Sequence, residues 1–157
     1  MAEEEKTPQQ KQEELQKMVS EIRGSQQNIE ALEKQIEVIK SSINEVESTE
    51  ETLEGIEEIE SGAEILVPIG SGSYLPAVVQ DTDKVLTELG ADLVAESPPK
   101  KVIDIVEKRK SDLEESLEEA QERIDDLKSN IEEIRPEAQK LMAEVESENI
   151  DTENQSG

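Results

Sequence analysis

Carboxylates are the most abundant side chains of this sequence that could take part in chemistry. There are 41 Asp and Glu residues against 16 Lys and Arg residues in a chain of 157. Carboxylates can bind hard cations, but no stretch has the spaced Asp/Asn–Gly–Glu pattern of an EF-hand loop. Cys and His are absent, so the sequence offers no thiol nucleophile, no imidazole base and no soft metal ligand. We therefore expect no enzyme, no metal site and no cofactor, and we interpret most of the acidic residues as solvated charge.

The turn Gly70-Ser71-Gly72-Ser73 is the segment that most invites comparison with a phosphate-binding loop. Such loops lead from a strand into a helix and carry a lysine or a longer glycine pattern. Here the turn joins two short apolar runs, and no lysine lies near it. A tight β-hairpin turn is the better interpretation, with Tyr74 as a strand residue that packs on a neighbour.

The charge balance excludes several other classes of partner. A net charge of −25 argues against nucleic acid, because phosphate binding needs a basic surface. No apolar run approaches the ~20 residues that span a bilayer, and the N-terminal sequence MAEEEKTPQQ does not read as a signal peptide. We expect a cytoplasmic protein without membrane contact. Because hydrophobic residues make up only 32% of the chain, we also expect an elongated fold.

Two long segments carry apolar residues at the alternating spacing of three and four that is typical of a coiled coil. We predict helices over residues 9–61 and 97–147, each about 75 Å long at ~1.5 Å per residue. Ser97 and Pro98 are the predicted N-cap and first residue of the second helix. Residues 1–8 and 148–157 are predicted to be flexible tails, the first of them acidic.

Similar lengths suggest that the two helices fold back on each other as an antiparallel pair. Residues 41–61 contain eight Glu and no basic residue, whereas residues 100–110 contain five Lys or Arg. Chain reversal between the helices would place these stretches side by side, and their opposite charges favour that register. The same alignment brings Glu50 level with Lys110 within the seam. It also brings Gly24 level with Pro136, two helix-weakening residues whose role as a hinge stays open.

The segment between the helices, residues 62–96, contains four short apolar runs separated by turn signals, which predicts two β-hairpins. Several runs are continuously apolar and need both faces covered, which a patch of 35 residues cannot do alone. We therefore predict that other chains complete the sheet. The predicted assembly residues are Ile65, Leu66, Val67, Ile69, Val78, Val79, Leu86, Leu93 and Val94.

The order of helix, two hairpins and helix, with the runs ILVPIGSGSYL and ESPPKKVIDIVEKR, resembles the alpha class of archaeal prefoldin subunits over about residues 9–147. The beta class has a single hairpin. The resemblance implies an α+β subunit with a long antiparallel coiled coil, whose hairpins form a β-barrel platform on oligomerisation. It implies a hexamer of two alpha with four prefoldin beta subunits, which captures non-native client proteins without ATP and delivers them to a group II chaperonin. The acidic excess resembles a halophilic version of the family.

If the chain is such a chaperone, apolar residues near the ends of its helical arms are the candidate client-binding residues. Spacing assigns several of them to the seam, whereas Val19 and Met142 lie off it and are the better candidates for exposure. The alternative is a coiled-coil scaffold or adaptor that binds one folded partner. Client identity, chaperonin contacts and the formation of homo-oligomers stay open. The seven candidate client-binding residues are Leu15, Met18, Val19, Ile22, Leu141, Met142 and Val145.

Overall fold

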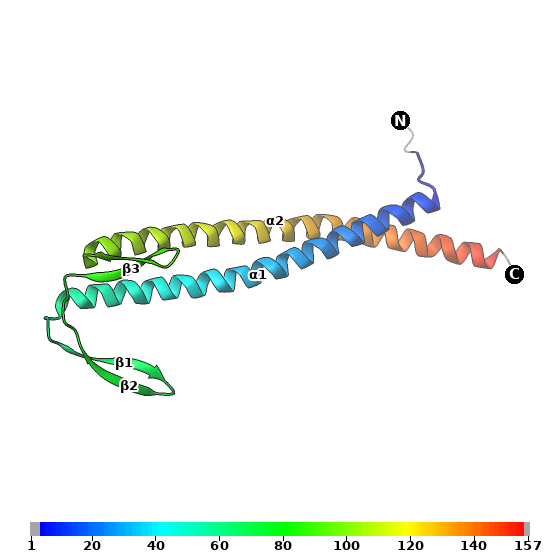
Figure 1. Cartoon of the computed structure of the whole chain (residues 1–157). Helices are drawn as coiled ribbons and strands as arrows, with labels where there is room; N and C mark the ends of the chain where they lie inside the picture. The colour runs from blue at the N-terminus through cyan, green and yellow to red at the C-terminus, as the bar shows by residue number, and fades with distance from the viewer. Residues whose placement is uncertain (1–3, 156–157) are drawn as a thin grey trace. The chain divides into compact units, whose positions relative to one another are not determined.

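The computed structural model describes residues 4–155 of the chain. It confirms the predicted α+β order of helix, two hairpins and helix (Figure 1). The chain divides into two units: a terminal unit, made of residues up to Glu37 and from Glu118 onward, and a central unit, Val38–Leu117. The elements are α1 (Pro8–Glu58), β1 (Glu64–Gly70), β2 (Ser73–Val78), β3 (Val85–Gly90), β4 (Leu93–Ser97) and α2 (Pro99–Asn154).

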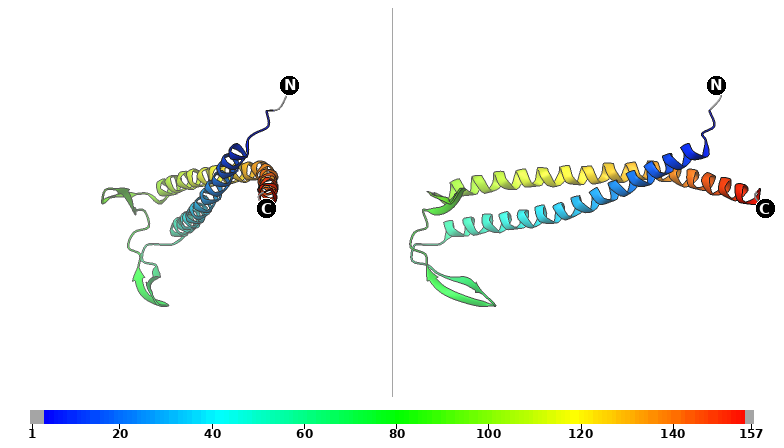
Figure 2. Two further views of the ribbon diagram at one scale, coloured as in Figure 1. Left: turned by 90° about the vertical axis from the view of Figure 1, so that its right-hand side faces the viewer. Right: turned by 45° about the vertical axis from the view of Figure 1, so that its right-hand side comes forward.

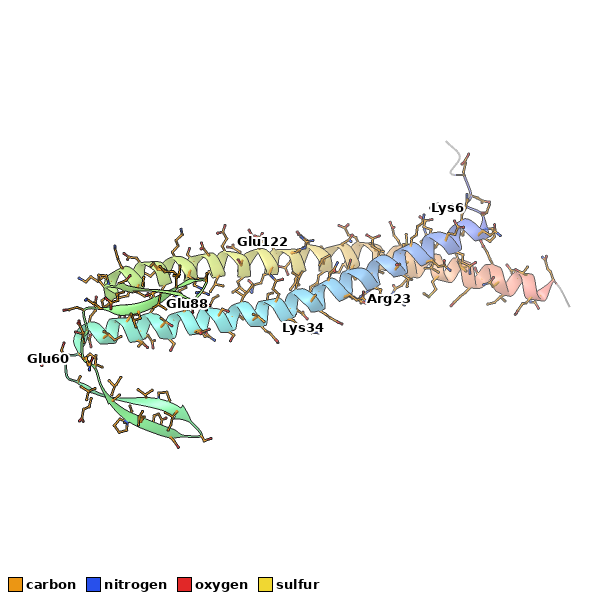
Figure 3. The ribbon with its side chains drawn as sticks, in the orientation of Figure 1. Lys6, Arg23, Lys34, Glu60, Glu88 and Glu122 are labelled. Carbon is orange, nitrogen blue, oxygen red and sulfur yellow. The ribbon has the colours of Figure 1, made fainter. Side chains whose placement is uncertain are left out.

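The terminal unit is a pair of antiparallel helical segments. Lys11 of α1 pairs with Glu148 of α2, and Glu21 accepts a hydrogen bond from Asn130. Residue numbers therefore increase along α1 in the direction in which they decrease along α2. The predicted heptad positions form the seam between the segments, whereas Arg23, Lys34 and Glu122 point away from it (Figure 3). The buried residues of this seam are Ser25, Ala120, Ile124, Ile131 and Ala138.

A capping box starts α1 at Pro8, one residue before the predicted boundary. The Thr7 hydroxyl accepts a hydrogen bond from the backbone N–H of Gln10 at 3.3 Å, and the Gln10 side chain accepts one from the Thr7 N–H at 3.0 Å. This reciprocal pair satisfies two donors of the first turn that have no partner within the helix. Pro8, at the first helical position, has no N–H to satisfy.

Helix α2 is longer than predicted and contains a proline. It continues to Asn154, so residues 148–154 of the predicted flexible tail are helical, and residues 156–157 lie outside the described range. Pro136 lies inside the helix, where it removes one backbone hydrogen bond. The ribbon of α2 changes direction in its orange stretch, which includes this part of the sequence (Figure 2). The predicted weak point of the pair at Gly24 and Pro136 stays a prediction.

The central unit contains the other ends of both helices. Its buried apolar residues are Ile39 and Leu53 from α1 and Pro99 and Val102 from α2. Helix α1 ends at Glu58, three residues before the predicted boundary. Helix α2 begins at Pro99, because the Pro98 carbonyl accepts the first helical hydrogen bonds. The N-cap position is therefore Pro98, and the assignment of that role to Ser97 was wrong.

Each hairpin forms its own two-stranded antiparallel sheet, β1 with β2 and β3 with β4. The turn at Gly70-Ser71-Gly72-Ser73 has positive φ at its first three residues, and such angles at both central residues are those of a type I′ hairpin turn. This confirms the hairpin interpretation of the segment. Ala91 and Asp92 adopt the same left-handed region (φ 51° and 60°) in the second turn.

Substitution of the two glycines Gly24 and Gly62 tests this description of the backbone. Nothing lies within 4 Å of a methyl group added to either residue, but Gly62 has φ +91° whereas Gly24 is helical. We expect Gly24→Ala to raise the free energy of unfolding by about 1 kcal/mol through helix propensity. Gly62→Ala should lower it, because alanine disfavours positive φ. Urea unfolding followed by circular dichroism measures both, and a destabilised Gly24→Ala variant would show that this glycine is needed for packing.

Candidate functional site

The predicted site residues all lie within residues 4–155. Within residues 4–155, no group of acidic side chains is arranged to hold a metal ion. In the same part of the chain, neither helix has an apolar window long enough to cross a bilayer. Two surfaces carry the predicted site residues: the hairpins of the central unit and the helix ends of the terminal unit.

The first hairpin exposes apolar side chains on both of its faces. Cross-strand partners share a face, so Val67 lies with Leu75 on one face and Leu66 lies with Pro76 on the other. Every residue of β1 is exposed. A two-stranded sheet with two apolar faces gains stability only when other groups cover it.

Prolines shape the edges of the same hairpin. The Val79 N–H donates to the Ala63 carbonyl at 2.9 Å, so alternation along the ladder turns the N–H groups of residues 77 and 75 inward. Pro76 lies between these two residues and therefore occupies an outward-facing position. Its cross-strand partner Leu66 also faces outward, and so does Pro68, two residues further along β1. Because proline has no backbone N–H, the outer edge of each strand lacks one hydrogen-bond donor near its middle. This restricts where another strand can pair.

The second hairpin differs in having one partly covered face. Val85, Thr87, Ala95 and Ser97 are half-buried and share a face, whereas Leu86 and Val94 on the other side are exposed. The exposed face is mixed, because Glu88 lies opposite Val94. This hairpin therefore offers one apolar surface where the first offers two.

The predicted assembly residues are gathered on these hairpins and are, with one difference, exposed. Eight of the nine have exposed fractions between 38% and 69%. Val79 is half-buried and lies just beyond β2, where its backbone pairs with Gly62 and Ala63. Sequence reasoning missed Leu75 and Leu89, which are as exposed as their neighbours. Both lie within the predicted apolar runs, which could have identified them as assembly residues.

The predicted client-binding residues divide into two groups in the terminal unit. Val19 and Met142 are 38% and 45% exposed, which agrees with their position off the heptad pattern. The remaining five are half-buried along the seam; these are Leu15, Met18, Ile22, Leu141 and Val145. A groove at these helix ends is lined by Met18, Leu141 and charged side chains that include Lys11, Lys140 and Glu144.

An ion pair closes the seam at this end. Lys11 lies seven residues before the seam residue Met18, and Glu148 lies seven residues after Leu141, so both occupy seam positions. The Lys11 ammonium is 2.6 Å from Glu148 and 3.5 Å from Glu144, and its side chain is only 19% exposed. The hydrogen bond to Glu148, helped by the negative charge of both glutamates and opposed by burial, raises the pKa of Lys11 above its ordinary 10.5.

A second ion pair lies in the central unit, with the signs reversed between the helices. Lys110 of α2 is 3.0 Å from Glu47 of α1. The hydrogen bond to Glu47, helped by the charges of Glu47, Glu50 and Glu114 and opposed by burial, raises the pKa of Lys110. Among the described residues this is the one ion pair between the Glu-rich stretch and the basic stretch. The predicted pairing of these stretches is therefore limited to Lys110.

Comparison with known proteins gives a consistent result. The family model described as "Prefoldin subunit" matches residues 25–144. The prefoldin subunit alpha of Methanopyrus kandleri is 35% identical over 77% of both chains. That of Halorubrum lacusprofundi is 37% identical over 43% of this chain, and the match spans only 44% of the relative's length. A filamentous prefoldin structure from Methanocaldococcus jannaschii has the same fold, with a TM-score of 0.66 at 24% identity over 75% of this chain and 98% of that one.

Reversal of the Lys11 charge tests the ion pair at the helix ends. In Lys11→Glu, the new carboxylate would face Glu144 and Glu148, and like charges in a seam repel. We expect spin labels near residues 12 and 147 to report a wider and broader distance distribution. The double variant Lys11→Glu/Glu148→Lys should restore the narrow distribution.

The same ion pair has a defined pH dependence. Because the pKa of Lys11 is raised on folding, its stabilising effect is present below the ordinary lysine pKa and is lost as the pH rises through the higher folded value. As the pH is raised from neutral, the label distance in the wild-type chain should therefore widen only above about pH 10.5. A distance that already changes near neutral pH would contradict this assignment.

Proposed function

The chain belongs to the prefoldin family, within its archaeal alpha class, and from this membership we propose that it is a subunit of an ATP-independent molecular chaperone. In this proposal the ends of the helical arms capture unfolded proteins, and the complex delivers them to a group II chaperonin. The observation that carries the proposal is the concentration of exposed apolar side chains on the two hairpins. Exposed apolar patches of this kind mark interaction sites. We therefore expect another subunit to cover these side chains.

Assembly through the hairpins follows from their surfaces. We propose that two copies of this chain and four prefoldin beta subunits join their hairpins into a closed sheet. Closure of a sheet removes its edges and buries both faces, which is what the doubly apolar first hairpin needs. The outward positions of Pro68 and Pro76 would leave strand pairing to the rest of each edge.

Capture of non-native proteins is assigned to the helix ends of the terminal unit. Val19 and Met142 supply apolar surface there without unpacking the seam. Methionine suits this task because its flexible, polarisable side chain adapts to varied partners. The seam residues Met18 and Leu141 line a groove at the same helix ends and extend the apolar surface available to a client.

A charge introduced into β1 tests the assembly surface. Val67→Asp would place a carboxylate in the proposed interface, where burial without a partner costs several kcal/mol. We expect native mass measurement to show loss of the complex with beta subunits, while circular dichroism still shows most of the helix. Val38→Asp is the matched control, because Val38 is an exposed helical valine and should assemble normally. If Val67→Asp keeps the native mass, the strands are not the assembly surface.

A second pair of substitutions tests client capture. Val19→Glu/Met142→Glu changes two exposed residues, so the fold and the assembled mass should be retained. We expect suppression of aggregation of an unfolded test protein, measured by light scattering without nucleotide, to fall by at least ~5-fold, since charge next to apolar contacts disfavours binding. Val38→Glu/Gln121→Glu, at two exposed neutral residues outside both proposed surfaces, is the control with the same charge change elsewhere on the helices. Full protection by the arm-end variant would move the binding surface away from the arm ends.

A further inference from the structure

The first three turns of α2 concentrate positive charge in an otherwise acidic chain. Five of the 16 basic residues lie within residues 100–110. Only Lys110 among them forms an ion pair within the part of the chain that the structure describes. The other four are exposed on the helix surface; they are Lys100, Lys101, Lys108 and Arg109.

Three of these cations surround an exposed isoleucine. At 100° per residue, Lys101, Lys108 and Arg109 lie within about 60° of Ile105 around the helix axis. Ile105 is 51% exposed, and it lies beside the seam, since its neighbour Val102 is buried. Lys101, Ile105, Lys108 and Arg109 form what we call the basic face. Asp112, one turn further along the same side, ends it.

The helix itself does not account for the basic face. Lys101 lies in the first turn, where a cation is unfavourable because the helix dipole places partial positive charge there. The eight Glu residues over 41–61 do not account for it either, since Glu47 bonds to Lys110 and no other ion pair joins the two stretches within residues 4–155. A single exposed isoleucine is ordinary, but one ringed by three cations without partners resembles the edge of a protein interface.

We propose that the basic face binds a carboxylate-rich surface of the subunit that completes the hairpins. This inference rests on the proposed function, because it assigns a second contact to the same assembly. Strand β4 ends at Ser97 and α2 begins at Pro99, so the basic face follows directly on the exposed strand residues Leu93 and Val94. Protein interfaces commonly combine an apolar centre with a charged rim, and Ile105 supplies an apolar contact within that rim.

Charge explains why such a rim is needed. The chain carries a net charge of −25, so any acidic partner is repelled as it approaches. Between residues 62 and 96 the only basic residue is Lys84, which leaves the hairpins without attraction of their own. The basic face provides local attraction next to the apolar strands, where it orients the incoming subunit and raises the association rate.

The test measures association of the full-length chain with the prefoldin beta subunit of the same organism by stopped-flow fluorescence at several KCl concentrations. The variant Lys101→Glu/Lys108→Glu/Arg109→Glu reverses the basic face. We expect it to associate on the order of 10- to 100-fold more slowly at low salt, with a gap that narrows as KCl rises. The control Lys17→Glu/Lys34→Glu/Lys128→Glu makes the same change in net charge with exposed cations of the terminal unit and should slow association less than about threefold.

Two further measurements distinguish loss of the basic face from loss of folding and from loss of an apolar contact. Lys101 lies in the first turn of α2, where glutamate suits the helix dipole, and Lys108 and Arg109 are exposed further along the helix, so circular dichroism should show no loss of helix in the triple variant. Ile105→Ala should raise the dissociation rate and leave the association rate unchanged, because it removes an apolar contact and no charge.

The proposal is overturned if the basic-face variant associates as fast as the control variant. It is also overturned if the basic face instead governs self-association of this chain, or its binding to a single-stranded DNA 20-mer used as a polyanion probe. Failure of the proposed function gives a different result, because the wild-type chain would then form no complex with the beta subunit at all.

Discussion

The structure depends on burial of one apolar seam between two helices. The chain has few apolar residues for its length, with 32% hydrophobic and 36% charged. Many of these apolar residues occupy the heptad positions of the two helices. A helix pair needs only one narrow stripe per helix to be stable, so it suits such a composition. The remaining apolar side chains, above all those of β1 and β2, are left exposed by residues 4–155. Exposed hairpins are thus a consequence of the same constraint that makes the seam.

Ion pairs at the seam favour its antiparallel direction. Lys11 on α1 pairs with Glu148 on α2 in the terminal unit, whereas Glu47 on α1 pairs with Lys110 on α2 in the central unit. A parallel arrangement would separate both pairs and leave the half-buried ammonium groups of Lys11 and Lys110 without these partners. The apolar heptads alone accept either direction, since each layer resembles the next. The two reversed pairs favour the antiparallel one.

Local patterns made most of the fold predictable from sequence. The heptads, the turn at Gly70–Ser73 and the apolar runs around it are short-range signals, and they placed both helices and both hairpins. The end of α2 was missed because Glu148 occupies a seam position with a charge, which an apolar pattern does not register. The start of α1 carried a readable signal in Thr7 and Gln10, the spacing of a capping box. The broad pairing expected between the Glu-rich and basic stretches failed because exposed residues on the outer faces of two helices do not meet.

The placement of the remaining charges links the fold to assembly. Most acidic residues lie on exposed helix faces, where they keep the arms soluble and repel other arms. The proposed assembly would occur against this repulsion, which the cations at the start of α2 offset locally beside the hairpins. Screening by salt shortens the range of both effects, but direct contacts between a cation and a carboxylate persist at close distance better than repulsion between separated surfaces. With five of its 16 cations at the start of α2, the chain would associate at that end in the proposed assembly while its acidic arms stay apart.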